Sequence, residues 1–530
     1  MIHEVIIVGS GPTGIAAAMG FVENGIVPLI LDVGYQPQSN ELFFNNFYNF
    51  RKLYESFNIM IGENYEGLSN VMNKKNFPPK LASPLMNFVT KDVEKFSPVI
   101  EKDFTVIQSF AMGGLANAWG AGLYRCVDDE LKGIPLSASG LAPYYDKLTK
   151  EIGISGDMDD LTPYFGSAEN LLPPLKLSEK SEKLFLQYNK KRKKLHAHGI
   201  YIGRPRLGVL SENYQNRSKY EYHNVETWLP NLSYIYTPSF TLQRLIKEDK
   251  IIYHKSVLVR CWSRADNHIT VHAVNINDGT NITFKCRKLV LATGTINSAK
   301  IVLNSKKDFM SKLALIDNPL IQIPLIFPSF IGSKFETKAF GLTNLNIIFN
   351  FKKYNMRLQG SIIELTSPSR AMFYEMFPFS AKDNLLLMRI FSPSVLVLFL
   401  YFPASIDNSG FLMLSPGGKL EVFGRSYNIN KKIIRKVIRI FMGLGVFTSS
   451  LLVKYSPTGH AVHYAGTLPM VKNPDQDYQC NEWGEVYKEP GVYVVDGSLF
   501  SYLPAKNISF TLMANSMRIA DNIAKKIKKQ

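Results

Sequence analysis

The chain has 530 residues, of which 46% are hydrophobic and 20% charged, so it can bury a large core and more than one domain. Its four cysteines lie far apart in the sequence, which argues against a disulfide scaffold, a zinc site or a cysteine-ligated cluster, and we expect no bound metal. The net charge of +17 is spread over the chain without a nucleic-acid-binding module, so we interpret it mainly as solvated surface and expect no nucleic-acid partner.

The first predicted element is a strand, Glu4 to Val8, close to the N-terminus. A strand at this position leaves no room for a signal peptide. The most apolar stretch, residues 384–403, is broken by Arg389 and Pro393, so it does not supply the uninterrupted run of about twenty apolar residues that a membrane span needs. It reads instead as a short helix followed by a buried strand, Val395 to Phe402. We therefore expect a cytoplasmic protein.

A glycine-rich turn follows the first strand. Gly9, Gly11 and Gly14 have the G-x-G-x-x-G spacing, a helical stretch comes next, and a second strand ends at Asp32. In a dinucleotide site the first glycine permits the tight turn, the second lets the backbone approach a pyrophosphate, and the third lets the helix pack on the strand. The helix N-terminus, with Pro12 and Thr13, offers N–H groups to phosphate, and the aspartate can accept from ribose hydroxyls. The acid disfavours NADP, which leaves FAD and NAD.

Further along the chain, the pattern predicts a β-meander over residues 256–286, with a hairpin turn at Asp278-Gly279, and then a buried strand from Leu289 to Ala292. That strand ends in Thr293-Gly294. A Rossmann core with a meander insertion and a strand ending in "ATG" resembles the two-dinucleotide-binding flavoproteins of the glutathione-reductase type. No second glycine fingerprint exists for NAD(P)H, so we infer that the nucleotide is FAD and that the substrate itself is the reductant.

The next segments predict the sheet of a second domain. Alternating or apolar runs at 345–351, 360–365, 395–402 and 411–424 read as strands, the last with a Pro416-Gly417-Gly418 turn. Residues 431–445 read as an amphipathic helix with Lys432, Arg435, Lys436 and Arg439 on its polar side.

Three more stretches carry a family resemblance: "SFAMGGLANAWGAGLYR" (109–125), "SGLAPYYDKLTKEIGISG" (139–156), and the C-terminal pair "HYAGTLPM" and "VVDGSLFSYLPAKNISFTLMANSMRIADNIAKKI". Together with the N-terminal fingerprint, these resemble the glucose–methanol–choline (GMC) oxidoreductases, a family of FAD enzymes. Four motifs in the family's order make chance agreement improbable. The sequences of the glycine loop and of "HYAGTLPM" resemble those of a bacterial branch of the family associated with surface polysaccharides, which implies a sugar substrate.

The resemblance implies roles for particular residues. His463 matches the histidine over the reactive face of the flavin, and Asn507 matches its polar partner, although Ile508 stands where the family usually has proline. Ala118 occupies the place at which some members attach FAD through a histidine, so we expect non-covalent FAD. The expected cofactor contacts are Gly9, Gly11, Pro12, Thr13, Gly14, Asp32, Gly113, Gly114, Asn117, Trp119, Val257, Thr293, Gly294, Asp496, Gly497, Asn507 and Ile508.

These residues could oxidise an alcohol. A neutral His463 can take the hydroxyl proton while the carbon gives a hydride to flavin N5, and Asn507 can orient the substrate oxygen. We expect the histidine to be unpaired, since a nearby carboxylate would favour its protonated form. Alternatives stay open: His463 as a structural residue, His460 as the base, Asn507 as an ordinary helix N-cap, and Trp119 as core filling rather than a platform for the flavin.

The expected fold is α/β, with a Rossmann-type FAD domain interleaved with an α+β substrate domain on an antiparallel sheet. We assign residues 1–50, 100–130, 235–305 and 475–530 to the FAD domain, and residues 51–99, 131–234 and 306–474 to the substrate domain. The predicted function is FAD-dependent oxidation of a CH–OH group of an alcohol or sugar. The alternatives are a non-redox, mutase-like flavoenzyme and a peripheral protein of the inner membrane face acting on a lipid-linked substrate. The electron acceptor cannot be read from the sequence.

Overall fold

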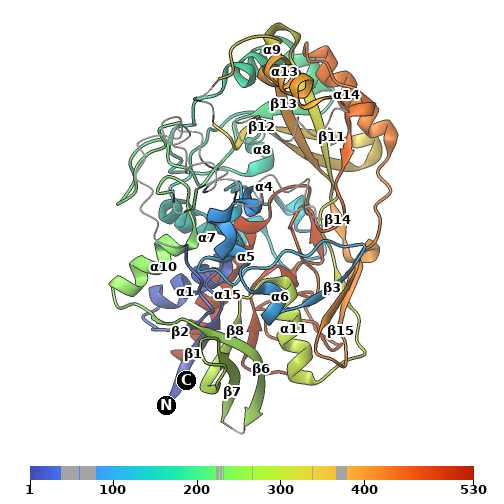
Figure 1. Cartoon of the computed structure of the whole chain (residues 1–530). Helices are drawn as coiled ribbons and strands as arrows, with labels where there is room; N and C mark the ends of the chain where they lie inside the picture. Colours follow the sequence, from blue (N-terminus) through green and yellow to red (C-terminus); the bar gives the residue numbers. More distant parts are fainter. Residues whose placement is uncertain are drawn as a thin grey trace.

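The computed structural model describes residues 1–37, 59, 62, 79–222, 226, 229–230, 232–265, 267–336, 338, 340–365 and 379–529. Residues 38–50 of the predicted FAD domain and nearly all of 51–78 of the predicted substrate domain therefore lie outside the described residues. Figure 1 shows an elongated molecule, with both chain termini at one end and the helices α9, α13 and α14 at the other.

The end of the molecule that holds the termini is built on a seven-stranded sheet. Its order is β5(Ile252–His254), β2(Leu29–Leu31), β1(Ile2–Val8), β8(Asn281–Leu291), β7(His268–Asn275) and β6(Val257–Ala265), and β18(Val492–Val494) also pairs with β8. The pairs β1–β2, β1–β8, β2–β5 and β8–β18 are parallel, whereas β6, β7 and β8 form an antiparallel meander. This arrangement confirms the predicted α/β class and the Rossmann-type core.

One strand joins what the sequence suggested were two. The last meander strand and the buried strand 289–292 are the single strand β8, so the prediction of separate strands was wrong. Its first part pairs with β7 and its last part with β1 and β18. The polar residues Arg287 and Lys288 do not interrupt it, because the ladder to β1 continues through Lys288.

Two helices from opposite ends of the chain pack together on this core. α1(Pro12–Glu23) lies against α15(Ser509–Ile527), and the Ser516 hydroxyl donates to the Thr13 carbonyl at 2.6 Å. Asn24 donates to the Asp521 carboxylate at 2.9 Å. The β1–α1 segment at the start of the sheet and the helix α15 therefore form one unit.

The other end of the molecule holds a six-stranded antiparallel sheet, in the order β17(Lys454–Tyr455), β10(Leu320–Ile326), β13(Val395–Tyr401), β12(Met356–Glu364), β11(Thr343–Phe351) and β4(Ile200–Gly203). Side chains alternate between its two faces. One face is apolar and packs against α9(Glu179–Ala197) and α14(Lys431–Gly443). The opposite face carries Asn346, Gln359, Ser361 and Tyr401, as the registers Ser361↔Asn346 and Gln359↔Tyr401 show.

The predicted hairpin at 411–424 forms, but in a different sheet. β15(Gly410–Leu414) and β16(Leu420–Phe423) join β9(Leu313–Leu315) and β3(Val99–Lys102) in a four-stranded sheet, so the prediction that the hairpin belongs to the substrate sheet was wrong. The hairpin's alternating pattern fixed the strands but not their partners, because β3 lies more than three hundred residues earlier in the chain. The domain boundaries stay a prediction.

The remaining helices connect these sheets: α4(Pro79–Ala82), α5(Asn87–Thr90), α6(Val93–Phe96), α7(Ala138–Ile152), α8(Thr162–Phe165), α10(Pro238–Lys247), α11(Thr295–Lys306) and α13(Ala381–Phe391). A short ladder of β14(Ala404–Ser405) with β19(Tyr502–Leu503) completes the described strands. Within the described part of the chain, no helix combines the length and apolarity needed to cross a membrane.

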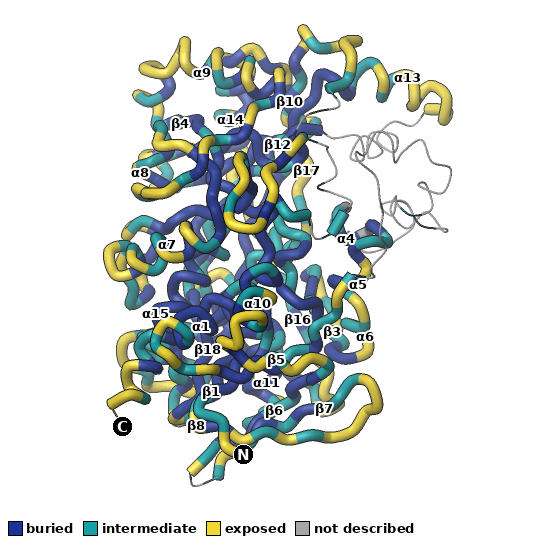
Figure 2. The backbone as a smooth tube through the Cα atoms, turned by 90° about the vertical axis from the view of Figure 1, so that its left-hand side faces the viewer, coloured by how far each residue is buried: buried dark blue, intermediate teal, exposed yellow. Residues whose placement is uncertain are grey.

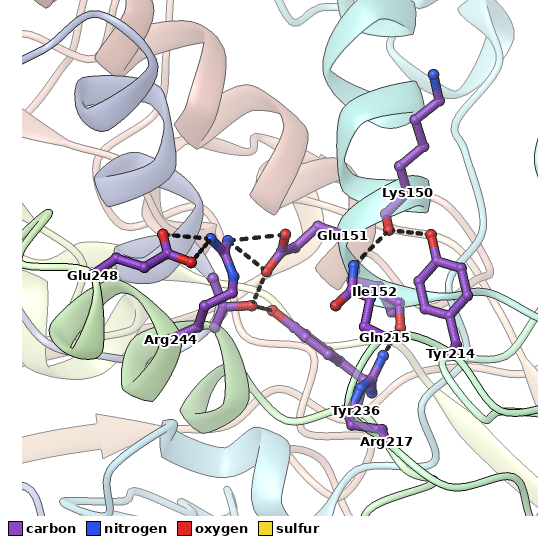
Figure 3. A network of polar contacts seen from close by, with 10 residues as sticks. Lys150, Glu151, Ile152, Tyr214, Gln215, Arg217, Tyr236, Arg244 and Glu248 are labelled. Atoms are coloured by element: carbon purple, nitrogen blue, oxygen red, sulfur yellow. Dashed lines mark hydrogen bonds and ion pairs between the residues drawn. The ribbon is translucent and has the colours of Figure 1, made fainter.

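A polar network ties α7 to α10 (Figure 3). Arg244 on α10 donates to both carboxylate oxygens of Glu151 on α7 at 3.0 Å, and Glu151 also accepts from Thr241, whose hydroxyl pairs with Tyr236. The Tyr236 carbonyl in turn accepts from the indole N–H of Trp119 at 2.9 Å. This network fixes the position of Trp119.

Candidate active site

The turn between β1 and α1 has the geometry that the glycine fingerprint predicted. Gly9 has a φ of +98°, where a side chain would be strained. A Cβ on Gly14 would lie 2.0 Å from the Gly9 carbonyl oxygen, so only glycine lets the helix approach the strand. A Cβ on Gly11 would meet no atom within 4 Å. The backbone at Gly11 is therefore open toward the cleft, at the N-terminus of α1.

Asp32 lies where β2 ends. Its carboxylate accepts hydrogen bonds from the Ser10 hydroxyl and, at 3.1 Å, from Tyr253. Burial raises the pKa of Asp32 to about 7. The residue is thus placed at the carboxyl edge of the sheet, where an acid accepts from a ribose in dinucleotide folds.

The open backbone and the acid face one cleft with an empty volume of about 1360 Å³. Most of the predicted cofactor residues line it: Gly9, Gly11, Pro12, Thr13, Asp32, Gly114, Val257, Thr293, Gly294, Asp496 and Gly497. The N-terminal residues Ser509 and Leu512 of α15 line it as well. An unobstructed helix N-terminus, a carboxylate one strand away and a long cleft fit a dinucleotide such as FAD.

Asp496 is held in place on the wall of this cleft. Its carboxylate accepts from the Ser298 hydroxyl at 2.5 Å, and from the backbone N–H and the hydroxyl of Ser498 at 3.0 and 2.7 Å. Burial raises its pKa. Asp496 thereby joins the start of α11 to the C-terminal segment along the cleft.

The glycine-rich loop at 113–119 lies over the fingerprint. The backbone N–H of Gly113 donates to Ser10, and a Cβ on Gly114 would lie 3.3 Å from the Cα of Gly11. Asn117 donates to the carbonyls of Met112 and Gly114 at 2.9 and 2.7 Å. Because both amide hydrogens are used within the loop, Asn117 shapes the loop.

Trp119 does not line the described cleft. Its ring packs against Tyr236, with centroids 6.4 Å apart, next to the buried residues of the core. Of the two interpretations of Trp119, the geometry agrees with core filling. Ala118, in the short 3₁₀-helix Gly114–Ala118, packs in a small apolar cluster with no group able to bond a cofactor.

His463 is partly buried and is held on both ring nitrogens by amide side chains. Its Nδ1 lies 2.9 Å from Oδ1 of Asn318, and its Nε2 lies 3.4 Å from Nδ2 of Asn507. The Tyr401 ring stacks on the imidazole, with centroids 5.4 Å apart. The expectation of an unpaired ring was wrong, although both partners are neutral amides.

The orientation of the Asn318 amide defines the state of His463. The Asn318 Nδ2 donates to the carbonyls of Phe402 and Pro504 at 2.8 and 3.0 Å, so its Oδ1 must face the imidazole. An acceptor at Nδ1 requires the proton there, which leaves the Nε2 lone pair free to accept. Burial lowers the pKa of His463 to about 4, so the ring is neutral at physiological pH.

Asp317 lies beside this site and contacts backbone only. It accepts from the backbone N–H of His463 at 2.8 Å and of Ala461 at 3.2 Å, and burial raises its pKa to about 7. The carboxylate therefore fixes the path of the chain around His463 and makes no hydrogen bond to the ring.

Asn507 is not the N-cap of the last helix. Ile508 occupies that position, without a side-chain cap, and the amide of Asn507 points to His463 instead. Asn507 is fixed from the preceding residue: the buried Lys506 ammonium contacts Glu130 at 2.6 Å and the Tyr164 carbonyl at 2.7 Å. α15 then begins at Ser509, with its N-terminal N–H groups beside the cleft.

The sequence missed several residues of the site. Asn318 and Asp317 come from a loop about 145 residues before His463, and the only local signal was a polar pair within an apolar run. Lys300 on α11 also lines the cleft. Its ammonium donates to Ser97 at 3.2 Å, and burial lowers its pKa to about 8. No cluster of potential metal ligands occurs among the described residues.

Solved structures share this fold, in which a Rossmann-type sheet is interleaved with a domain on an antiparallel sheet. The solved structures with this fold include pyridoxine 4-oxidase from Mesorbium loti, with a TM-score of 0.60 and 12% identity over 100% of this chain and 99% of that one. Two variants of formate oxidase from Aspergillus oryzae RIB40, studied for FAD modification, have TM-scores of 0.62 and 13% identity over 99% of both chains. No curated protein sequence matches the chain.

Residues 448–516, which include His463, Asp496 and Asn507, match the family model described as GMC oxidoreductase. The resemblance to the GMC oxidoreductases is therefore confirmed, and members of this family bind FAD.

Proposed function

We propose that the protein is a FAD-dependent oxidoreductase that oxidises a CH–OH group, with His463 as the general base. The observation that carries this proposal is the neutral imidazole whose Nδ1 is engaged by Asn318 and whose Nε2 faces Asn507. A histidine in this state can accept a proton at Nε2 without first losing one.

Each residue then has a defined task. His463 accepts the hydroxyl proton of the substrate at Nε2, and the Nδ2 of Asn507 donates to the same substrate oxygen and orients the C–H bond. Asn318 keeps the imidazole in the accepting tautomer and stabilises the imidazolium that forms. FAD, when bound, supplies the acceptor for the hydride. The N-terminal N–H groups of α15, beside the cleft, would stabilise negative charge on a cofactor bound there.

We propose a polyhydroxylated substrate of the sugar class. The sheet face beside Tyr401 carries neutral polar groups, among them an Asn346 amide that bonds Tyr124 and Ser361. Gln359, directly opposite Tyr401 in the register, is buried, and neither amide atom has a partner among the described residues. The charged Arg357 on this face is engaged by Asp129. The unpaired Gln359 amide, opposite the Tyr401 whose ring stacks on the base, favours a ligand with several hydroxyls.

We further propose that FAD is held without a covalent bond, because Ala118 has no nucleophile. Acid precipitation of the purified yellow protein should release all of the flavin into the supernatant. Flavin that stays with the pellet would show that another residue forms a bond to it.

The function is tested by rapid mixing of the FAD-loaded protein with sugars and sugar nucleotides under anaerobic conditions. We expect the flavin to bleach with formation of a carbonyl product. His463→Ala should keep its FAD and reduce it about 10²–10⁴-fold more slowly, because it lacks the general base. His460→Ala is the control and should retain most of the rate.

Other outcomes identify the alternatives. Turnover of a sugar without net bleaching would indicate the non-redox, mutase-like flavoenzyme. Reduction of His463→Ala at the parent rate would contradict the assignment of the base. We also propose that the protein is cytoplasmic and associates with the inner face of the membrane.

A further inference from the structure

The surface around α14 has two properties that the chemistry of the site does not use. α14 lies at the end of the molecule far from the chain termini (Figure 1). Its N-cap Asn430 accepts from Lys432, and its apolar residues Ile433, Ile434, Val437, Ile438 and Phe441 are buried against the six-stranded sheet. The helix therefore buries its apolar face against the core and exposes its polar face, together with Met442 near its C-terminal end, to solvent.

That polar face is entirely basic. Lys431, Lys432, Arg435 and Arg439 are exposed, and α9 adds Lys191, whose ammonium contacts the Gly443 carbonyl at the end of α14. The sequence contains no Asp or Glu from residue 422 to residue 474. No ion pair among the described residues involves the four exposed cations of α14. Two lysines in the first helical turn also oppose the helix dipole.

The last turn of α14 and the segment that follows the helix expose large apolar side chains beside this charge. Met442 is 53% exposed, Phe447 52% and Leu451 92%. Leu451 lies in the short 3₁₀-helix Ser450–Leu452, which contacts α14. Uncompensated cations next to protruding apolar side chains are the pattern of a surface that meets anionic lipid, where cations contact headgroups and apolar side chains enter the acyl boundary.

We propose that this basic-apolar surface, formed by Lys191, Lys431, Lys432, Arg435, Arg439, Met442, Phe447 and Leu451, docks the protein on an anionic lipid bilayer. The occupant follows from charge complementarity, since the surface offers cations without a carboxylate in the surrounding segment. The apolar stretch 384–403 does not form this surface. Its strand β13 is central in the sheet, and Leu396, Leu398 and Leu400 are buried on the α14 side.

The test is sedimentation of the full-length, FAD-loaded protein with vesicles of phosphatidylglycerol and, in parallel, of phosphatidylcholine. We expect binding to the anionic vesicles only, and weakening as salt is raised. The double variant Arg435→Gln, Arg439→Gln should bind at least about tenfold more weakly, since each cation near the surface contributes about fivefold. Leu451→Ser should weaken binding while leaving its salt dependence unchanged.

The matched control is Lys528→Gln, Lys529→Gln, which removes the same charge from exposed positions at the C-terminus. This control should bind vesicles like the parent. Equal loss of binding in both double variants would show a response to net charge alone and would overturn the docking surface. Equal binding to both lipids, absence of binding, or release from the vesicles by a short DNA duplex would overturn it as well.

Discussion

At the scale of single residues, the state of His463 is decided by one amide. Asn318 gives both of its N–H groups to backbone carbonyls, so only its oxygen remains for the imidazole. The proton is thereby held at Nδ1, and burial keeps the pKa of the ring at about 4. The neutral base is therefore present well below physiological pH.

Replacing Asn318 by Asp tests this arrangement. A carboxylate at Nδ1 stabilises the imidazolium, so the pKa of His463 rises and the neutral form is lost as the pH falls through that higher value. The acid limb of flavin reduction, near pH 4 in the parent, should move up by about one unit or more. The measurement is the rate of flavin reduction against pH in rapid mixing.

Asn318→Ala is the matched control, since it loses the same two contacts to backbone without adding charge. The acid limb of its pH profile should stay near that of the parent, even if its rate of flavin reduction changes. If the limb of Asn318→Asp coincided with that of Asn318→Ala, the amide would not control the protonation of the base.

The sequence predicted His463 and Asn507 as site residues but did not predict Asn318. These two residues could be predicted because both stand in motifs near the C-terminus. Asn318 could not, because a polar residue in a loop acquires meaning only when the fold places it against a particular ring nitrogen. Gln359 shows the same limit: the strand predicted at 360–365 begins one residue after it, and the sequence could not show that its amide has no partner among the described residues.

At the scale of elements, the turn between β1 and α1 separates two roles of glycine. A Cβ on Gly14 would collide with the Gly9 carbonyl, whereas a Cβ on Gly11 would project into open space. Gly14 is therefore needed by the fold itself, whereas Gly11 is needed by a ligand that approaches the backbone.

Gly14→Ala should therefore lower the free energy of unfolding by about 1–3 kcal/mol through overpacking. Gly11→Ala should lower it by less than about 1 kcal/mol, the range of an N-cap change, yet weaken FAD binding about tenfold or more. Urea unfolding of the FAD-free proteins, together with FAD titration by fluorescence, separates the two effects.

A large loss of stability in Gly11→Ala, or normal FAD affinity in the same variant, would contradict this division.

Periodicity and turn residues located the first strand, the meander, α1 and α14, because each depends on neighbours in the sequence, whereas α7, α9, α10 and α11 were not predicted. Which strands pair with each other was harder to predict from the sequence. The 411–424 hairpin pairs with β3 and not with the six-stranded sheet, and β8 runs through two predicted strands, since partners distant in the chain decide both.

At the scale of the whole molecule, the α/β class and the interleaving of two units could be predicted from the order of motifs along the chain. The fingerprint, the meander and the C-terminal motifs had to meet in one cleft, although hundreds of residues separate them. The two faces of the six-stranded sheet could not be assigned in the same way. Which face packs on α9 and α14, and which adjoins His463, depends on how the units close on each other.

The packing of α15 on α1 has a consequence for the order of events during synthesis. The fingerprint is synthesised long before α15, so its helix finds its neighbour only once α15 has been made. The parallel partner β18 and the wall residue Asp496 also come late. A nascent chain thus carries the nucleotide motif for most of its translation without the cleft that the motif serves, and contacts of such long separation form slowly. Cofactor loading consequently follows the synthesis of α15, and a chain interrupted before α15 leaves the apolar side of α1 for chaperones to cover.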